Sequence, residues 1–376
     1  MQFIDLKTQQ KNIRQNIETR LKQVLDHGQY IMGPEITELE KKLCHYVGVK
    51  HAIAVSSGTD ALLLALMCYD VGPGDAIITT PFTFISTVEV ICLLGATPVF
   101  VDIDPKTYNI DPFAIEKTII NCQKESYNVR GIIPVDLFGL PADYDAINVF
   151  AQAFNLFVIE DAAQSFGAIC NDQRTCSMTD IACTSFFPAK PLGCYGDGGM
   201  CFTNDDAHAA KIKSLMLHGQ GSHRYEHIHI GINGRLDTMQ AAILLEKFAI
   251  FDDELLARQS VANIYTQLFN KYSSIITPYI PFNYQSSWAQ YSIQLENADQ
   301  RQALQTHLQN NDIPTAIYYP IPIHQQPAFK NKNKQSFPVA EAVSQRIMSL
   351  PMHPYLTLDQ QKTIISTVLK GLGYNI

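Results

Sequence analysis

The chain has 376 residues, of which 46% are hydrophobic and 17% charged, a composition typical of a globular protein and not of a disordered or fibrous one. Its formal net charge is −8 and it has no block of Lys and Arg, so we expect no nucleic-acid partner. Its longest apolar runs, such as residues 61–67, are far shorter than the roughly 20 residues of a membrane-spanning helix. The sequence therefore predicts no membrane insertion, and small-molecule chemistry is the default expectation.

The N-terminus and the cysteines predict a cytoplasmic location. Residues 1–17 alternate apolar and polar side chains and lack the apolar core and the cleavage site of a secretion signal. The nine cysteines are odd in number, scattered and mostly within apolar stretches. This distribution favours reduced thiols over a disulfide framework.

The first half of the chain predicts an α/β fold. Residues 1–47 are expected to form two helices, the second favoured by Pro34 at a first-turn position. From about residue 50 to 205, short β-branched runs alternate with helical patterns at 58–69, 111–122 and 141–154. The predicted strands are "HAIAVSS", "DAIITT", "TPVFVDI", "GIIPVDL", "LFVIED", "IACTSFF" and "GGMCFT". This alternation is typical of a mostly parallel, doubly wound sheet, which binds ligands outside the carboxyl ends of its strands.

The second half predicts a long helical stretch and then a smaller unit. Residues 235 to about 272 have a helical pattern. After them the pattern changes to strand, helix, strand and helix, through "WAQYSIQL", "DQRQALQTHLQN", "IPTAIYY" and "TLDQQKTIISTVLKGLG". We therefore predict a large domain over residues 1–272 and a small C-terminal α+β domain over residues 273–376.

The stretch "AVSSGTDALLL" predicts an anion site. A strand turns through Ser56, Ser57, Gly58 and Thr59 into a helix, whose free N–H groups and hydroxyls suit a phosphate. Simple capping of the helix by Ser or Thr explains the same residues when they are taken alone.

Two further strand ends carry ionisable groups. In "FVIEDAAQSFGA" a strand ends with Glu160 and Asp161, and at most one of these adjacent side chains faces a pocket. Asp161 suits either a helix cap or the partner of a protonated heterocyclic nitrogen. In "SFFPAKPLGCYGDGG" Lys190 follows another strand, and burial beside aromatic and proline residues is expected to lower its pKa. A phosphate cradle, a carboxylate and a Schiff-base lysine in this order point to pyridoxal 5'-phosphate (PLP).

With these motifs the chain resembles the DegT/StrS family of PLP-dependent nucleotide-sugar aminotransferases. The resemblance covers essentially the whole length and implies an aspartate-aminotransferase-like fold, PLP fold type I. It is carried by "HGQYIMGPEITELE", "SSGTDAL", "PFTFISTVEVICLLGATPVFVDID", "EDAAQSFGA", "FFPAKPLGCYGDGG", "GINGRLDTMQAA", "YYPIPIHQQPA" and "SLPMHP".

The resemblance implies roles for residues around the cofactor ring. Lys190 would be the catalytic residue that binds PLP covalently and moves protons, and Asp161 would meet the pyridine nitrogen. Gln164 would lie near the phenolic oxygen, and Phe84 would stack on the ring. Taken alone, Phe84 is equally a core aromatic residue.

The resemblance also implies a phosphate site built by two subunits. Gly58, Thr59 and Ser185 would hold the phosphate on one subunit, and Asn233 would reach it from the other. This arrangement implies a homodimer with shared active sites. Taken alone, Ser185 is also a strand residue and Asn233 a turn former.

The expected substrates are L-glutamate and a nucleotide-linked keto sugar. The motifs are most similar to the branch that transaminates UDP-2-acetamido-2-deoxy-3-oxo-glucuronate for surface polysaccharide of the O-antigen type. Phe187, Pro188 and Gly234 stand where much of the wider family has a histidine or the tyrosine of "NYR". Arg235 suits a uronate carboxylate or a structural ion pair. Further residues expected to line the substrate pocket are Gly28, Tyr30, Tyr318, Tyr319 and His324.

Three alternative activities remain open at this point. The first is a 3- or 4-keto aminotransferase acting on a neutral UDP- or dTDP-sugar. A related PLP-dependent sugar dehydratase carries histidine where Lys190 stands, so the lysine argues against dehydration. A PLP-binding regulatory protein without catalysis is the third.

The histidine-rich segment "HGQGSHRYEHIHI" is a candidate metal site. His223, His227 and His229 are conceivable zinc ligands, but only Glu226 accompanies them as a carboxylate. The segment precedes the Asn233 turn, and we expect a mobile active-site loop and no metal.

Overall fold

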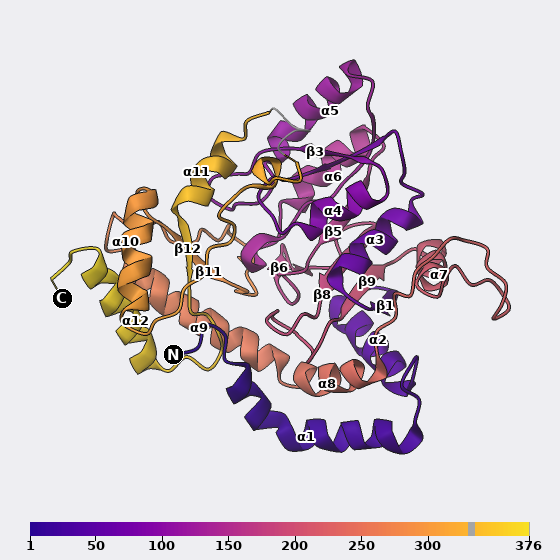
Figure 1. Cartoon of the computed structure of the whole chain (residues 1–376), viewed down its shortest axis with the longest axis horizontal. Coiled ribbons are helices and arrows are strands. Elements are labelled where there is room, and N and C mark those ends of the chain that lie inside the picture. Colours follow the sequence, from indigo (N-terminus) through magenta and orange to yellow (C-terminus); the bar gives the residue numbers. More distant parts are fainter. Residues whose placement is uncertain (330–334, 376) are drawn as a thin grey trace.

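A seven-stranded mixed sheet forms the centre of the molecule in the computed structural model, which describes residues 1–329 and 335–375 (Figure 1). The strand order is β1-β9-β8-β5-β4-β2-β3. Strand β9 runs antiparallel to β1 and β8, and all other neighbours pair in parallel. The strands are β1 (His51–Val55), β2 (Asp75–Thr79), β3 (Thr97–Phe100), β4 (Asn128–Ile132), β5 (Phe157–Asp161), β8 (Ile181–Ser185) and β9 (Gly199–Thr203). The predicted α/β fold with a mostly parallel sheet is confirmed.

Helices cover both faces of the sheet, which explains why its strands are nearly continuous apolar runs. In β1, Ile53 and Val55 pack in the core that includes α3 and α7, whereas Ala52 and Ala54 pack against α2 and α8. Helices α5 and α6 extend this second layer over β2, β4 and β5. The helices of this part are α1 (Leu6–His27), α2 (Pro34–Val47), α3 (Gly58–Cys68), α4 (Ser86–Leu93), α5 (Ile115–Lys124), α6 (Tyr144–Ala153), α7 (Asp206–Leu215) and α8 (Thr238–Phe248).

The helical stretch predicted from residue 235 to 272 is two helices. Helix α8 ends before Ala249, and α9 (Phe251–Phe269) starts after Ile250, whose side chain packs against the cluster formed by α1 and α8. Three acidic residues occupy the first turn of α9, where the positive end of the helix dipole favours them.

The C-terminal elements and α9 form a separate hydrophobic core. Strands β11 (Tyr291–Gln294) and β12 (Ile347–Leu350) pair in antiparallel fashion beside α10 (Ala298–Gln309), α11 (Pro338–Arg346) and α12 (Leu358–Gly371) (Figure 1). Short strands β6 (Ile169–Cys170), β7 (Gln173–Arg174) and β10 (Tyr284–Gln285) form a third sheet. The domain boundary at residues 272 and 273 stays a prediction.

The strand predicted at "IPTAIYY" was wrong. This segment makes a single bridge, from Ala316 to Ser349, and Tyr319 then leaves to meet Gln164 across the molecule. The partner of β11 is instead β12, which the sequence pattern did not reveal.

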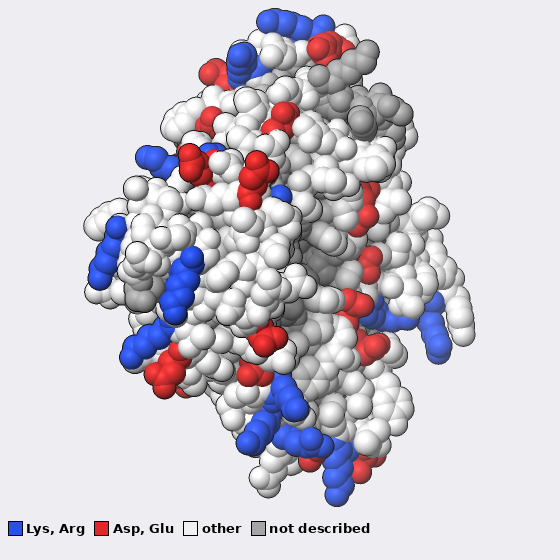
Figure 2. Space-filling view, turned by 60° about the vertical axis from the view of Figure 1, so that its left-hand side comes forward, with Lys and Arg blue, Asp and Glu red and all other residues white. Residues whose placement is uncertain are grey.

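Charged side chains of both signs are intermixed on the face shown in Figure 2, which is hollowed near its middle. Among the described residues, no helix is both long enough and apolar enough to cross a bilayer.

Candidate active site

The turn between β1 and α3 has the geometry of an anion site. Ser57 caps α3 by accepting a hydrogen bond from the Asp60 amide at 3.0 Å. The amides of Gly58 and Thr59 lie in the first turn, where helix N–H groups lack intrahelical acceptors. A Cβ at Gly58 would lie 2.7 Å from Cβ of Ser185, so only glycine lets the end of β8 approach this turn. Three of the predicted phosphate residues are thereby brought together.

Asp161 ends β5 as a buried carboxylate. Its Oδ2 accepts a hydrogen bond from Thr87 Oγ1 at 2.7 Å, and its Oδ1 accepts one from the Ala163 amide at 3.2 Å. Burial raises the pKa of Asp161, and these donors together with Lys190 oppose that rise. The donors thus support an ionised carboxylate at a site that water hardly reaches.

Lys190 sits on a loop that folds back on itself after β8. The Lys190 amide bonds to Phe187 O at 2.9 Å, and the Cys194 amide bonds to Phe186 O at 2.8 Å. A Cβ at Gly193 would lie 2.5 Å from Phe187 O, so the crossing of this loop requires glycine. Burial lowers the pKa of Lys190 to about 8, against the opposing charge of Asp161. A fraction of the amine is therefore neutral near pH 7.

Gln164 and two aromatic residues border the same region. Gln164 Oε1 accepts a hydrogen bond from the Phe138 amide at 2.8 Å, and its Nε2 donates one to Tyr319 Oη at 3.1 Å. Phe84 exposes 54% of its surface and lies 6.3 Å from Tyr319 between ring centroids. Phe84 thus offers a free aromatic face of the kind that a ring cofactor stacks on.

The segment around Asn233 lies beside the phosphate turn. Gly234 O accepts a hydrogen bond from the Ser56 amide at 3.0 Å, and Arg235 bridges to Val55. Asn233 itself is exposed. Arg235 Nε is buried and has no hydrogen-bond partner among the described residues.

Two more predicted substrate residues lie next to this segment. Tyr30 O accepts a hydrogen bond from the Thr238 amide at 3.0 Å, and the Tyr30 side chain is half exposed. Gly28 caps the C-terminus of α1 with a φ of 70°, a conformation that favours glycine. Tyr30 is thereby held beside the segment that follows Arg235, and the contact of Gly28 and Tyr30 with a substrate stays a prediction.

His324 is more deeply buried than the sequence indicated. Its side chain is 4% exposed, its Nε2 lies 3.0 Å from Glu341 Oε1, and its ring packs on Phe337. Tyr318 lies between Phe3 and Tyr319. The predicted substrate contacts of Tyr318, Tyr319 and His324 stay predictions.

The histidine-rich loop is closed by its own polar groups. Glu226 accepts a hydrogen bond from the Ser222 amide at 2.8 Å, and His227 Nδ1 lies 2.9 Å from His218 O. Within residues 1–329 and 335–375, no group of three or more His, Cys, Asp or Glu residues is placed to hold a metal ion.

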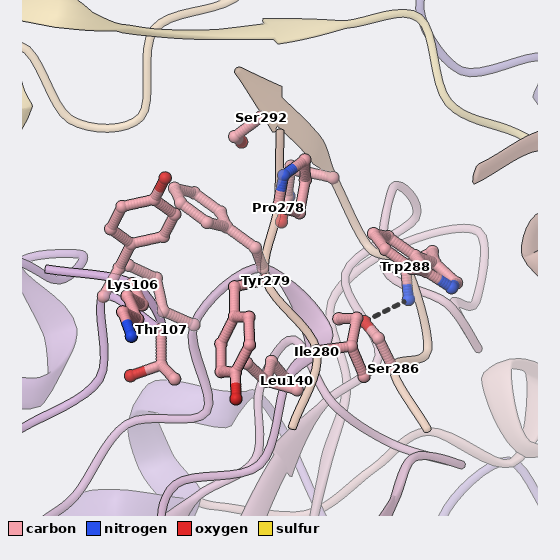
Figure 3. A pocket seen from close by; sticks show the side chains of 13 residues that line it. Lys106, Thr107, Leu140, Pro278, Tyr279, Ile280, Ser286, Trp288 and Ser292 are labelled. Atoms are coloured by element: carbon pink, nitrogen blue, oxygen red, sulfur yellow. Dashed lines mark hydrogen bonds between the residues drawn. The ribbon is translucent and has the colours of Figure 1, made fainter. Parts of the chain in front are cut away.

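A small, mostly apolar pocket lies between the loops that carry Tyr279, Leu140 and Trp288 (Figure 3). It is bounded by residues 106–108, 137–140 and 278–292, and the Trp288 amide bonds to Ser286 Oγ at its edge. None of the predicted cofactor residues lines it. Phe138 connects the pocket to the site, because its amide holds Gln164.

The sequence reasoning missed the hydroxyl groups at the start of α4 and in the turn before it. Thr87 bonds to Asp161, Thr83 Oγ1 lies 2.9 Å from Thr87 Oγ1, and Ser86 Oγ lies 2.9 Å from Thr59 Oγ1. The spacing of these three residues in "PFTFIST" places them on one side of a helix start, which is the signal that could have found them.

The residues described fit PLP as a set. The turn that a Cβ at Gly58 would obstruct suits the phosphate, the buried carboxylate of Asp161 suits the ring nitrogen, and the lysine with the lowered pKa suits the aldehyde.

The chain matches a known family of aminotransferases over nearly its whole length. A family model described as the DegT/DnrJ/EryC1/StrS aminotransferase family matches residues 11–369, and the chain belongs to this family. Its members are PLP-dependent transaminases, so PLP is the cofactor of this enzyme.

Individual relatives match over nearly their full length. The chain is 49% identical to the UDP-2-acetamido-2-deoxy-3-oxo-D-glucuronate aminotransferase of Pseudomonas aeruginosa, covering 98% of this chain and 99% of the relative. It is 40% identical to a UDP-N-acetyl-3-dehydro-alpha-D-glucosamine 3-aminotransferase of Acidithiobacillus ferrooxidans, covering 98% and 96%. A crystal structure of a DegT DnrJ EryC1 StrS aminotransferase from Brucella abortus has a TM-score of 0.96 at 46% identity and full coverage of both chains.

The close approach of Gly58 and Ser185 predicts a sharp effect of one methyl group. We expect Gly58→Ala to weaken PLP binding by about tenfold or more, because overpacking of this kind costs about 1–3 kcal/mol and separates the phosphate residues. Titration of the apo-protein with PLP measures the effect. Gly72→Ala is the matched control, because nothing lies within 4 Å of a Cβ at Gly72; equal weakening by both variants would contradict the prediction.

Proposed function

We propose that this enzyme transfers the amino group of L-glutamate to UDP-2-acetamido-2-deoxy-3-oxo-D-glucuronate, for the synthesis of a surface polysaccharide of the O-antigen type. The observation that carries the proposal is the 49% identity, over nearly the whole of both chains, to the relative that bears this activity in its name. The lysine, carboxylate and phosphate turn of the site support the transamination chemistry.

Each site residue has a role in this proposal. PLP, when bound, supplies an electron sink that stabilises negative charge on the substrate carbon next to the amino group. Asp161 holds positive charge on the ring nitrogen, and Phe84 supports one ring face. Lys190 Nζ takes and returns the proton at the substrate carbon, which its pKa of about 8 suits at neutral pH.

The phosphate is bound at the first turn of α3. The backbone amides of Gly58 and Thr59 and the hydroxyl groups of Thr59 and Ser185 bind it there, and Gln164 orients the cofactor from the side of Tyr319.

Arg235 is the proposed partner of the uronate carboxylate. Its Nε is buried without a hydrogen-bond acceptor among the described residues, which leaves a donor available for an anionic ligand. The second candidate is a neutral 3-keto UDP-sugar, which is favoured by the 40% identity to the relative named for such a substrate.

The enzyme is proposed to act in the cytoplasm as a homodimer with shared active sites. Asn233 is exposed beside the phosphate turn, and Tyr30, Ile31 and Met32 expose 43–50% of their surfaces next to it. A neighbouring exposed apolar cluster of this kind supports coverage by a second copy of the chain.

A substrate panel tests the proposal. We expect glutamate-dependent turnover of the UDP-linked 3-oxo uronate, and lower kcat/KM for neutral UDP- and dTDP-linked 3-oxo and 4-oxo sugars. Arg235→Gln should lower kcat/KM for the uronate by about 10²-fold, because a buried charged partner is lost, and should change the value for neutral sugars much less. Turnover restricted to neutral 4-oxo sugars would overturn the choice of substrate.

A further inference from the structure

Two carboxyl groups are buried together directly behind Asp161. Glu160 and Asp136 are both 0% exposed. Glu160 precedes Asp161 in β5, so its side chain faces the opposite side of the sheet, toward α6. Asp136 follows β4, the neighbouring parallel strand, and lies on this same side. The proposed function gives neither residue a role.

Asp136 accepts three hydrogen bonds from two segments of the chain. Its Oδ1 accepts from the Ala142 amide at 2.8 Å and from Tyr144 Oη at 2.7 Å, and its Oδ2 accepts from Ser165 Oγ at 2.7 Å. Its own amide donates to Asp161 O at 3.1 Å. These three accepted hydrogen bonds favour the ionised form of Asp136 over its protonated form.

Glu160 has one satisfied oxygen and one orphan. Its Oε1 accepts from the Cys176 amide at 2.7 Å, whereas its Oε2 is buried without a donor in the described part of the chain. The side chain of Asp136 is the neighbour with which the Glu160 carboxyl group interacts. Two carboxyl groups bond to each other only when one of them is protonated.

The surroundings place the proton on Glu160. The titratable groups that interact with the pair are Tyr144 from α6, Cys170, Cys176 and Asp161, and none of these is a cation. Burial and the charge of Asp136 raise the pKa of Glu160 well above its usual range. Burial also raises the pKa of Asp136, but only to about 6, because of the donors that it accepts from.

We propose that Glu160 donates a hydrogen bond to Asp136, and that this carboxyl pair is a positioning unit for the cofactor-binding edge of β5. Asp136 holds the end of β5 through its backbone bond to Asp161 O. Through Ser165 it also holds the turn that carries Gln164. The positioning role rests on the proposed function, whereas the shared proton does not.

The variants Glu160→Gln and Asp136→Asn separate this role from simple packing. A glutamine amide donates the hydrogen bond that the protonated acid donates, so E160Q should keep the PLP affinity of the apo-protein within about threefold. Asparagine has one acceptor oxygen where the carboxylate has two, so D136N should weaken PLP binding by about tenfold or more. Glu160→Leu should weaken it likewise, because Asp136 then loses its donor.

A matched control lies at the amino ends of the strands, opposite the carboxyl ends that carry the site. Asp75, at the amino end of β2, is a buried carboxylate that accepts from the Gly72 amide and from Asn128. Asp75→Asn should lower stability in thermal unfolding without changing PLP affinity. Equal losses of PLP affinity in D75N and D136N would overturn the positioning role.

The proton itself is measured on the apo-protein. The infrared spectrum near pH 7 should show the C=O band of a buried carboxylic acid, which should disappear in E160Q and remain in D75N. The free energy of unfolding should also depend on pH. Because the pKa of Glu160 is raised in the folded state, its contribution to stability is present below about pH 4.5 and is lost as the pH rises toward the raised pKa. E160Q should lack that loss.

The two proposals fail by different outcomes. An absent acid band, or a loss of PLP affinity in E160Q as large as in D136N, would overturn the carboxyl pair. Failure of the wild-type apo-protein to bind PLP would overturn the proposed function and the positioning role, and the infrared band would still decide the protonation of Glu160.

Discussion

Lys190→Ala is expected to reduce transamination by about 10⁴-fold, because it removes both the nucleophile and the group that moves the proton. The variant should still bind PLP through the phosphate and ring contacts, but without a covalent bond. Stopped-flow absorbance after addition of glutamate measures the half-reaction. Mass spectrometry after borohydride reduction should locate the wild-type adduct on residue 190 and find none in the variant.

Lys247 supplies a matched control. It is 1% exposed, burial lowers its pKa to about 8 as it does for Lys190, and its ammonium group lies 5.1 Å from the centre of the Tyr195 ring. Lys247→Met should therefore retain the adduct. An adduct that survives in Lys190→Ala and disappears in Lys247→Met would show that Lys247, and not Lys190, is the nucleophile.

The pH dependence of covalent loading is a second measure of the same amine. Only the neutral amine attacks, so the rate at which apo-protein is covalently loaded with PLP should rise with pH and level off above about 8. An exposed lysine would reach this plateau only above its ordinary pKa of about 10.4. A rate that still rises steeply above pH 9 would show that burial does not lower the pKa of Lys190.

The Lys190→Ala variant also tests the shared active site. Mixed Lys190→Ala and Asn233→Ala subunits should form heterodimers with one intact site, and activity should reappear on mixing. Each variant alone should stay impaired. Absence of recovery, although the subunits demonstrably exchange, would contradict the contribution of Asn233 from a partner subunit.

Most strands of the large sheet could be predicted because they are buried on both faces, as β2, β5 and β9 are. Alternation between two cores is visible in β1, where Ile53 and Val55 face one layer and Ala54 the other. The same apolar pattern gave a wrong strand prediction at residues 313–319. Tyr319 fits the pattern, but it is held by a hydrogen bond from Gln164 and not by a strand partner. Long-range partners of this kind override local preference.

The candidate site was predictable where chemistry follows a strand directly, as it does at Asp161 and Lys190. Its supporting groups were not, because the sheet and not the sequence spacing brings them together. Thr87 reaches Asp161 from α4, and Asp136 meets Glu160 across β4 and β5. These partners are far apart in the chain, and no local motif links them.

Asp161→Asn is expected to lower transamination by about 10³-fold, the scale on which loss of one preorganised electrostatic partner reduces kcat. Asparagine is nearly isosteric with aspartate, but it cannot hold positive charge on the ring nitrogen. The wild-type rate should fall as the pH drops through the pKa of Asp161, which burial raises, because the neutral acid cannot hold that charge either. The variant should lack this acid limb, and steady-state kinetics between pH 5 and 9 measures both effects.

Thr87→Val weakens the stabilisation of the Asp161 carboxylate without removing it. It removes the hydroxyl that donates to Asp161 Oδ2 at 2.7 Å and leaves the Ala163 amide as a donor. With less stabilisation of the carboxylate, the acid limb should move to higher pH, and the rate at pH 7 should fall by about tenfold, the value of one hydrogen bond to a charged group. An acid limb that persists unchanged in Asp161→Asn would assign it to another group and remove Asp161 from the ring nitrogen.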